Sequence, residues 1–257
     1  MRLMRQYIYK MQNSFEIQKD DIISDNQFFS QIPQDYMFMN ILKFIETKTI
    51  NFIWLGQIDY NIALSYQQEI HKLIQDDKVK DTILLLEHPH VYTFGKNADK
   101  NHLLPSYNKE ADVIQTDRGG EITYHGPGQL VVYPIINLAR YKKSITWYIK
   151  TIEKVIIDSL KHYNIRALRK QGLIGVWVEE EKIAAIGVRL SKWITMHGFA
   201  LNVKPDMKFY NGMIPCGIFE YGITSIFQLT KNNVEILDLV QNIIHHMVLN
   251  FKEKNEI

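Results

Sequence analysis

The sequence predicts an α+β protein, in which helices flank a mixed, largely antiparallel sheet. Three observations support this fold class. Strand-like segments outnumber helical ones, several strands come in pairs of hairpin length, and only a few long segments have helical periodicity. Single strands alternating with helices would instead indicate a parallel βαβ sheet.

Three segments have the periodicity of amphipathic helices. In residues 59–76, apolar side chains recur every four positions behind Asp59, a residue that commonly caps a helix N-terminus. The second helix is expected to begin after Ser144 and to run for about five turns to His162, with one buried apolar stripe. The third is expected over residues 234–251.

The remaining regular segments are typical of strands. A Gly-Pro-Gly sequence at residues 126–128 bends the chain between two of them. No internal repeat and no Pro-, Gly- or Ser-rich linker follows residue 50, so residues 49–257 are expected to form a single domain behind an N-terminal extension, residues 1–48. The expected strands cover residues 82–86, 91–94, 112–116, 121–125, 129–136, 175–178, 182–190 and 193–203.

Composition argues against two classes of protein. The 257 residues are 46% hydrophobic, which suits a globular core. The net charge of +2 lacks the basic excess of a dedicated nucleic-acid-binding protein. Since no apolar run approaches the roughly 20 residues that cross a bilayer, neither a nucleic-acid partner nor a membrane is expected.

The cysteine content indicates the cellular compartment. A single cysteine, Cys216, excludes an internal disulfide and favours a reducing compartment, so we expect a cytoplasmic protein. The alternative is an organelle, because the first fifteen residues are basic and free of acids, as in import signals, although acids follow from Glu16 onward.

No metal site is expected. The candidate ligands His88, His90, His125 and His197 do not have the spacing of strong zinc motifs. A histidine among these would take part in catalysis only if it lay close to the reacting groups.

Cys216 is the candidate nucleophile, held between Pro215 and Gly217. A thiol with an ordinary pKa near 8.5 is only a few per cent thiolate at neutral pH, so it needs a nearby base or positive charge. The alternative is that Cys216 is simply a small buried apolar side chain.

Lys182 is the candidate partner of that thiol. It begins a strand in which alternation places it on one face with Ala184, Ile186 and Val188, and the small residues of the strand leave room beside it. Keeping a lysine neutral at neutral pH costs about 4.6 kcal/mol, so a thiolate–ammonium pair is the cheaper resting state. The alternative is a surface lysine beside the acidic turn of residues 179–181.

The segment of residues 118–129 is rich in glycine and polar residues. Glycines let the backbone approach a ligand closely and leave amides free to donate, but an ordinary hairpin turn has the same composition. The glycine-rich motifs that bind nucleotide phosphates are absent from the sequence. We therefore expect no cofactor.

Three blocks, residues 118–129, 182–203 and 215–218, together resemble the lipoyl(octanoyl) transferase family. They follow residues 87–95 in the order that the family has. The resemblance implies an α+β fold similar to the catalytic domain of biotin and lipoate protein ligases, with a single acyl pocket. Lys96 stands where the family often has arginine, and lysine lacks the two-pronged geometry of arginine toward a phosphate or carboxylate.

The resemblance also implies the roles of individual residues. Cys216 would accept the acyl group and Lys182 would be its acid/base partner. The substrate would be bound by Arg118, Gly119, Gly120, Glu121, Ile122, Thr123, Tyr124, His125, Gly126, Ala184, Ala185, Ile186, Gly187, His197, Gly198, Phe199 and Ala200.

The implied reaction is the first step of endogenous protein lipoylation. A monomer would move an octanoyl group from octanoyl-acyl carrier protein to a lysine of lipoyl domains, in 2-oxoacid dehydrogenases and in the glycine cleavage H protein. Thioester exchange is close to isoenergetic and amide formation runs downhill, so ATP is not required. The alternatives are an ATP-dependent lipoate ligase on the same scaffold and a non-catalytic module that binds an acyl group or a carrier protein.

Overall fold

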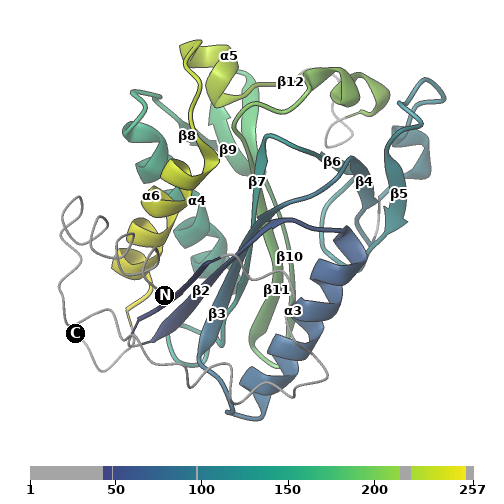
Figure 1. Cartoon of the computed structure of the whole chain (residues 1–257). Helices are drawn as coiled ribbons and strands as arrows, with labels where there is room; N and C mark the ends of the chain where they lie inside the picture. Colours follow the sequence, from purple (N-terminus) through teal and green to yellow (C-terminus); the bar gives the residue numbers. More distant parts are fainter. Residues whose placement is uncertain (1–42, 48, 97, 215–220, 253–257) are drawn as a thin grey trace.

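A computed structural model describes residues 43–47, 49–96, 98–214 and 221–252 of the chain. A large mixed sheet lies between helices on its two faces, with a smaller sheet at one end (Figure 1). The strand pairs of the large sheet are antiparallel except for β2 with β3 and β10 with β12, which are parallel. The predicted α+β class with a mixed, largely antiparallel sheet is therefore confirmed.

The large sheet has nine strands within the described residues, and its order leaves β12 as a side branch on β10. Along the sheet these strands are β1 Lys43–Glu46, β2 Ile50–Gln57, β3 Asp81–Glu87, β7 Gln129–Ile135, β11 Ile194–Asn202, β10 Glu181–Ser191, β9 Leu173–Val178 and β8 Leu168–Lys170, with β12 Gly222–Ile223 beside β10. The small sheet consists of β5 Asp112–Gln115, β4 Val91–Phe94 and β6 Thr123–His125.

Two of the three long helices begin where a capping side chain predicts. The Asp59 carboxylate accepts the backbone N–H groups of Asn61 and Ile62, and the Ser144 hydroxyl accepts that of Trp147. The helices are α3 Tyr60–Gln75, α4 Ile145–Lys161, α5 Ile226–Thr230 and α6 Ile236–Asn250, with short 3₁₀ turns η3 Lys100–His102 and η4 Met207–Gly212. All three predicted helices are confirmed to within two residues at each end.

The core is divided by the large sheet. Helix α3 packs on one face, where Ala63 and Ile70 meet Leu84 and Val131. Helices α4 and α6 cover the opposite face with a larger apolar cluster (Figure 1). A third cluster joins the small sheet to η4. Among the described residues, no helix combines the length and apolarity needed to cross a membrane.

The sheet begins earlier than the predicted domain boundary. Strand β1 lies inside residues 1–48, the predicted extension, yet it pairs antiparallel with β2, with Lys43 opposite Trp54. Residues 43–46 therefore belong to the sheet of the catalytic part. The division of the chain into an extension and a domain otherwise stays a prediction, since residues 1–42 lie outside the described part.

Strand β10 contains an irregularity that corrects one prediction. Lys182 lies opposite Trp177 and Ala184 lies opposite Val176, so β10 has one residue more than β9 between these pairs, a β-bulge. Ile183 and Ala184, adjacent in sequence, both belong to the core cluster against α4. The strict alternation that grouped Lys182 with Ala184 on one face is therefore wrong.

Candidate active site

A cavity of about 440 Å³ lies where β10, β11 and β7 meet the small sheet. The pairing of β9 with β10 ends at Ala184, so the following residues of β10 are free to line this cavity. Apolar side chains from β7 and β11, such as Val131 and Phe199, form part of its lining. The space and its lining suit a medium-sized ligand with an apolar part.

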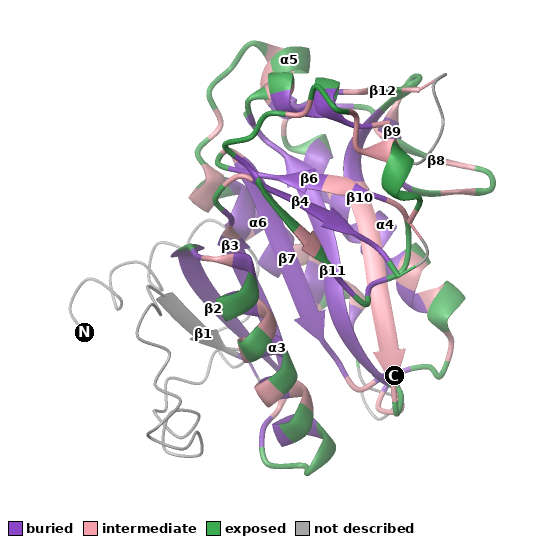
Figure 2. Ribbon diagram, turned by 90° about the vertical axis from the view of Figure 1, so that its right-hand side faces the viewer, coloured by how far each residue is buried: buried purple, intermediate pink, exposed green. Residues whose placement is uncertain are grey.

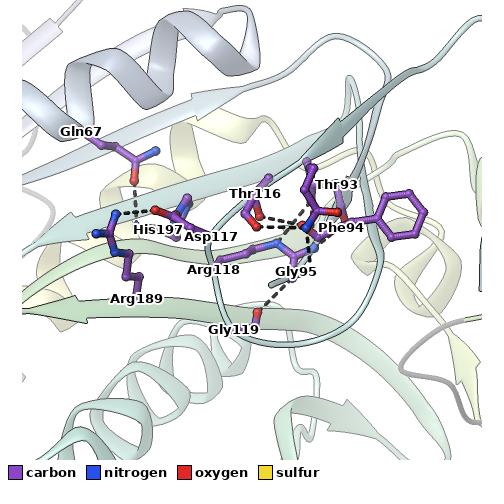
Figure 3. Close-up of polar contacts among 11 residues, drawn as sticks. Gln67, Thr93, Phe94, Gly95, Thr116, Asp117, Arg118, Gly119, Arg189 and His197 are labelled. Atoms are coloured by element: carbon purple, nitrogen blue, oxygen red, sulfur yellow. Dashed lines mark hydrogen bonds and ion pairs between the residues drawn. The ribbon is translucent and has the colours of Figure 1, made fainter. Parts of the chain in front are cut away.

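One wall of the cavity is the loop of residues 117–120, which a buried arginine fixes. The Arg118 guanidinium donates to the Thr93 carbonyl at 2.6 Å, to the Thr93 hydroxyl at 2.9 Å and to the Gly119 carbonyl at 3.0 Å (Figure 3). The Gly119 N–H donates to the Val188 carbonyl at 3.0 Å. The loop therefore bridges β4 and β10, and Arg118 acts here as a clamp on the backbone.

The loop approaches both strands so closely that glycine is required. A Cβ atom on Gly95 would lie 1.8 Å from the Gly120 carbonyl oxygen, and one on Gly187 would lie 2.9 Å from that of Gly119. Real Cβ atoms do not make contacts this short. Gly95 and Gly187 thus allow the loop to lie against the two strands and shape the cavity.

His125 lines the cavity and belongs to a buried hydrogen-bond network. Its Nδ1 donates to Gln129 Oε1 at 2.7 Å, because the Gln129 amide nitrogen itself donates to Asn202 Oδ1 at 2.9 Å. Its Nε2 lies 3.4 Å from the Thr93 hydroxyl, which also accepts from Arg118. Burial lowers the pKa of His125 well below its ordinary value, so the ring is neutral.

The same network reaches the strand beside Lys182. Asn202 Nδ2 donates to the Thr224 carbonyl at 3.0 Å, and the Thr224 N–H donates to the Lys182 carbonyl at 3.0 Å. Polar contacts therefore run from Arg118 beneath the cavity to β10 and β12. The two ends of this network are held in fixed relative positions.

His197 lines the cavity in a left-handed backbone conformation, with φ of 56°. Its Nε2 lies 2.8 Å from Asp117 Oδ1, its N–H donates to Gln67 Oε1 at 2.8 Å, and Asp117 also pairs with Arg189 (Figure 3). Burial lowers the pKa of His197, partly offset by Asp117. Burial would raise the pKa of Asp117, but its contacts with His197 and Arg189 lower it below the ordinary value.

Lys182 is buried and lines the cavity. Its ammonium group lies 4.7 Å from the centre of the Trp177 ring, which is a cation–π contact. Gly175 leaves space for the side chain, because a Cβ atom there would lie 3.3 Å from Lys182 Cε. The alternative of a surface lysine is thus wrong, since the structure buries Lys182 in the cavity wall.

Two other lining residues flank the segment that contains Cys216. Met213 precedes it and Ile223 follows it, and both line the cavity. Ile223 is the direct neighbour of Lys182 in the parallel pair of β12 with β10. Cys216 itself lies outside the described residues, so its position stays a prediction.

Comparison with known proteins identifies the family. The family model of the lipoyl protein ligase A/B catalytic domain matches residues 59–248. A chloroplastic octanoyltransferase of Arabidopsis thaliana is 42% identical over 212 residues, which cover 78% of this chain and 75% of that protein. The chain belongs to the octanoyltransferase family. Membership makes it an acyltransferase.

Further matches agree with this family. An octanoyltransferase of Cytophaga hutchinsonii is 40% identical over 221 residues, covering 77% of this chain and 91% of that protein. Among solved structures, lipoate-protein ligase A bound with ATP is similar with a TM-score of 0.63 and 15% identity, covering 79% of this chain and 87% of that one. The biotin protein ligase of Aquifex aeolicus with biotin and ATP has a TM-score of 0.51 and 15% identity, covering 79% and 70%. The predicted likeness to both ligase folds is thus confirmed.

Most residues that the octanoyltransferase resemblance implied for substrate binding do line the cavity. They come from residues 118–125, from β10 and from β11, three segments distant in sequence. They are Arg118, Gly119, Gly120, Glu121, Ile122, Thr123, His125, Ala185, Ile186, Gly187, His197, Gly198, Phe199 and Ala200. Their contacts with a substrate stay a prediction.

Three implied residues lie behind the cavity. Tyr124 is fully buried and its hydroxyl bonds to His90 Nδ1 at 2.7 Å. Gly126 makes room for that hydroxyl, because a Cβ atom there would lie 2.0 Å from it. Ala184 packs in the core on account of the bulge in β10. These three residues therefore pack behind the lining and support it.

Other lining residues were not among the predicted ones. Tyr60, at the start of α3, and Tyr133, in β7, present aromatic rings to the cavity. Tyr133 donates to His88 Nε2 at 2.8 Å, while His88 Nδ1 donates to the Ile58 carbonyl at 2.7 Å. Gln129 ends the sequence block of residues 118–129 and Asn202 lies in the block of residues 182–203, and their place in these blocks is the signal that could have found them. The lining also includes Gln129, Asn202, Tyr210, Met213, Ile223, Ile145, Ile149, Leu173 and Ile174.

Within the described part of the chain, no group of three or more His, Cys, Asp and Glu side chains could hold a metal ion. His88 and His125 lie near each other, with ring centres 5.7 Å apart, but both are engaged in hydrogen bonds.

Proposed function

We propose that this chain transfers an octanoyl group from octanoyl-acyl carrier protein to a lysine of lipoyl domains, through a thioester on Cys216. Membership of the octanoyltransferase family supports the overall reaction. The donor, the acceptors and the covalent intermediate are the finer parts of the proposal. The donor and the acceptors rest on the resemblance to the family, and the covalent intermediate rests on the residues around the cavity.

One observation carries the proposal. The buried amine of Lys182 lies in the wall of an acyl-sized cavity, next to the strand that leads out of the Cys216 segment. Met213, three positions before Cys216, lines the same cavity, and three residues of chain span at most about 11 Å. These positions support the proposal that the Cys216 thiol meets the Lys182 amine at this cavity.

The first half-reaction forms the acyl-enzyme. The Cys216 thiolate, stabilised by the Lys182 ammonium, attacks the thioester carbonyl of the donor. The bond from the carbonyl carbon to the carrier's sulfur breaks, and the departing thiolate takes a proton from Lys182. The octanoyl chain is then bound to Cys216, and Lys182 is neutral.

The second half-reaction delivers the acyl group. The neutral amine of an acceptor lysine attacks the new thioester, and Lys182 removes the proton that the amine must lose as the amide forms. Cys216 leaves as a thiolate, so both groups return to their starting charges. Each proton that Lys182 gives in the first step is regained in the second.

The apolar part of the cavity suits the alkyl chain. Val131, Phe199 and Ala200 offer apolar surface, and the small residues of β10 leave space for the chain. Burying methylene groups there stabilises the bound acyl group by about 0.8 kcal/mol for each. The loop wall at Gly119 and Gly120 lies across the same cavity.

The acceptors proposed are the lipoyl domains of 2-oxoacid dehydrogenases and the glycine cleavage H protein, and the enzyme is proposed to act as a cytoplasmic monomer. Import into an organelle is the alternative location. It is motivated by the basic first fifteen residues. Localisation of the tagged full chain in its own cell distinguishes the two.

Intact mass spectrometry tests the proposed reaction. Incubation of the purified chain with octanoyl-acyl carrier protein is expected to add one octanoyl group to the protein, and Cys216→Ala is expected to add none. Addition of a lipoyl domain should then remove the group from the enzyme and place it on the acceptor. Lys182→Met should lower the rate of transfer by about 10²–10⁴-fold, as expected for loss of an acid/base group.

The controls separate the alternatives. An ATP-dependent ligase would modify the lipoyl domain only with ATP and a free acid, and would do so equally well with Cys216→Ala. A binding module would retain the acylated carrier protein without any change in mass. Either result would overturn the proposal.

A further inference from the structure

Positive charge is concentrated in one stretch of this nearly neutral chain. Between Lys142 and Gly175 there are eight Lys and Arg residues and two acids, Glu153 and Asp158, a net charge of +6. The whole chain carries +2, so the remainder is net negative, at −4. This stretch consists of the approach to α4, the helix itself and the β8–β9 hairpin.

The fold brings these parts together as one surface. Arg169, in β8, donates through Nη2 to the Lys150 carbonyl of α4 at 2.7 Å and through Nε to Glu153 Oε2 at 2.8 Å. The other Glu153 oxygen accepts the Gly175 N–H of β9 at 3.3 Å. In Figure 2 the labels of β8, β9 and α4 lie together beside β10. We call the surface of residues 142–175, which comprises the approach to α4, the helix and the β8–β9 hairpin, the basic rim.

Several cations of the basic rim lack an acidic partner. Lys154 and Lys161 pair with Asp158, and Lys170 pairs with Glu180. Among the residues that the structure describes, no carboxylate lies within ion-pair distance of the cations that remain. These are Lys142, Lys143, Lys150 and Arg166, all exposed.

Apolar side chains complete the surface and connect it with the cavity. Ile145 is 40% exposed and Ile174 is 56% exposed, yet both also line the cavity. Gly175, the next residue after Ile174, is the one that leaves space for the Lys182 side chain. Exposed isoleucines among unpaired cations are typical of a surface that another protein covers.

We propose that the basic rim is the docking surface for the acyl donor, an acidic carrier domain that presents the acyl group on its arm. This inference rests on the proposed transfer reaction. The charge of the rim is complementary to an acidic partner, which would speed association and orient the complex. The rim also continues into the apolar lining of the cavity. The donor brings an alkyl chain, which needs such an apolar path, whereas the acceptor brings only the amine of a lysine. The rim therefore suits the donor better than the acceptor.

The test compares a protein donor with a small donor. The variant Lys150→Glu with Arg166→Glu reverses two exposed charges outside the cavity lining. We expect it to raise KM for octanoyl-acyl carrier protein by about tenfold or more at low salt, with kcat nearly unchanged, because rim charges act on association. With octanoyl-pantetheine, which has no protein part, KM and kcat should equal those of the wild type.

A matched control reverses the same number of charges on the other side of the sheet. Lys72→Glu with Lys78→Glu, at the end of α3, should leave KM for both donors unchanged. The difference between the rim variant and the wild type should shrink as salt rises, since exposed charges are screened beyond about 10 Å at 0.1 M salt.

Three outcomes would overturn the inference. The rim variant could change both donors equally, which would place Lys150 and Arg166 in the support of the cavity. It could raise KM for the lipoyl-domain acceptor instead, which would make the rim the acceptor's surface. It could also leave the carrier protein's KM unchanged. A different result concerns the proposed function. If the wild type transfers no octanoyl group from either donor, the proposed transfer reaction itself is wrong.

Discussion

The two sides of the cavity differ in how their polar groups are used. In and beside the loop wall, residues 117–120, buried polar groups such as the Arg118 guanidinium and the His125 ring are bonded to other parts of the chain. In the basic rim, cations such as Lys150 are exposed without an acidic partner among the described residues, and Ile174 is largely open to solvent.

The difference indicates a division of labour. Buried hydrogen bonds fix a geometry, since each unsatisfied group would cost free energy, and the loop wall therefore gives the cavity one defined shape. Exposed charges contribute little to the stability of the free protein. Residues of the rim can therefore be selected for contact with a partner without a loss of stability. Variants in the two regions should fail in different ways.

The largest effect is expected for Arg118→Met. The change leaves the Thr93 and Gly119 carbonyls without their donor, at about 1–3 kcal/mol for each unsatisfied group. We expect unfolding in urea to show a loss of about 3–5 kcal/mol. Transfer from octanoyl-acyl carrier protein and from octanoyl-pantetheine should fall together, because the cavity itself loses its shape.

Thr93→Val is the milder version of the same test. It removes the hydroxyl that accepts from Arg118 but retains the Thr93 carbonyl, so the protein should fold and lose about 1–2 kcal/mol. Both donors should again be affected equally. A variant that impaired only the carrier-protein donor would break the distinction between the loop wall and the basic rim.

The sequence predicted the helices well, because each has a local cause. The apolar stripe and the Asp59 and Ser144 caps are properties of neighbouring residues, and α3 and α4 begin at these caps. Strand β2 was not predicted, because its residues from Ile50 to Gly56 are buried without alternation. Such a run, paired in parallel with β3, has no period from which a strand can be inferred.

The bulge in β10 shows where the sequence was insufficient. Nothing local distinguishes Lys182-Ile183-Ala184 from a regular strand, and the extra residue is apparent only from the register against β9. The loop wall was predictable as a block of glycines and polar residues. The clamp of Arg118 on Thr93 joins residues 25 positions apart, and only the fold reveals it.

Two glycines, one from each side of the cavity, make a second comparison. Gly95, behind the loop wall, has no room for a Cβ atom, whereas Gly172, at the tip of the basic rim, has open space but a φ of 78°. Gly95→Ala should cost about 3 kcal/mol, since it forces the Gly120 carbonyl away. Gly172→Ala should cost about 1 kcal/mol, the strain of a left-handed alanine. Urea unfolding of both variants measures the difference.

The relative order of these two costs is the decisive result. Equal losses would mean that the loop wall yields as easily as the rim, and that its shape is not fixed by the close approach to β4. Thermal unfolding in parallel shows whether each variant still unfolds in one transition, as the comparison of free energies requires.

An effect about as small as that of Gly172→Ala concerns pH and the buried histidines around the cavity. Burial lowers the pKa of His88 to about 4, although its bond to the Ile58 carbonyl partly offsets this. Because the unfolded chain binds the proton more readily, with a pKa near 6.5, stability is complete above about pH 6.5 and falls as the pH drops toward 4. From about pH 7.5 to about pH 5.5, His88 alone should lower the free energy of unfolding by about 1.4 kcal/mol.

His88→Gln isolates this contribution. The variant is expected to be less stable than the wild type at about pH 7.5, because it loses the donor to Ile58, but its stability should decline less steeply toward about pH 5.5. The slope that persists is expected from His125 and His197, whose pKa values burial also lowers. If the free energy of unfolding of the variant declined as steeply as that of the wild type, the titration of His88 would contribute nothing to the pH dependence. His88 would then not be held as a neutral ring in the folded protein.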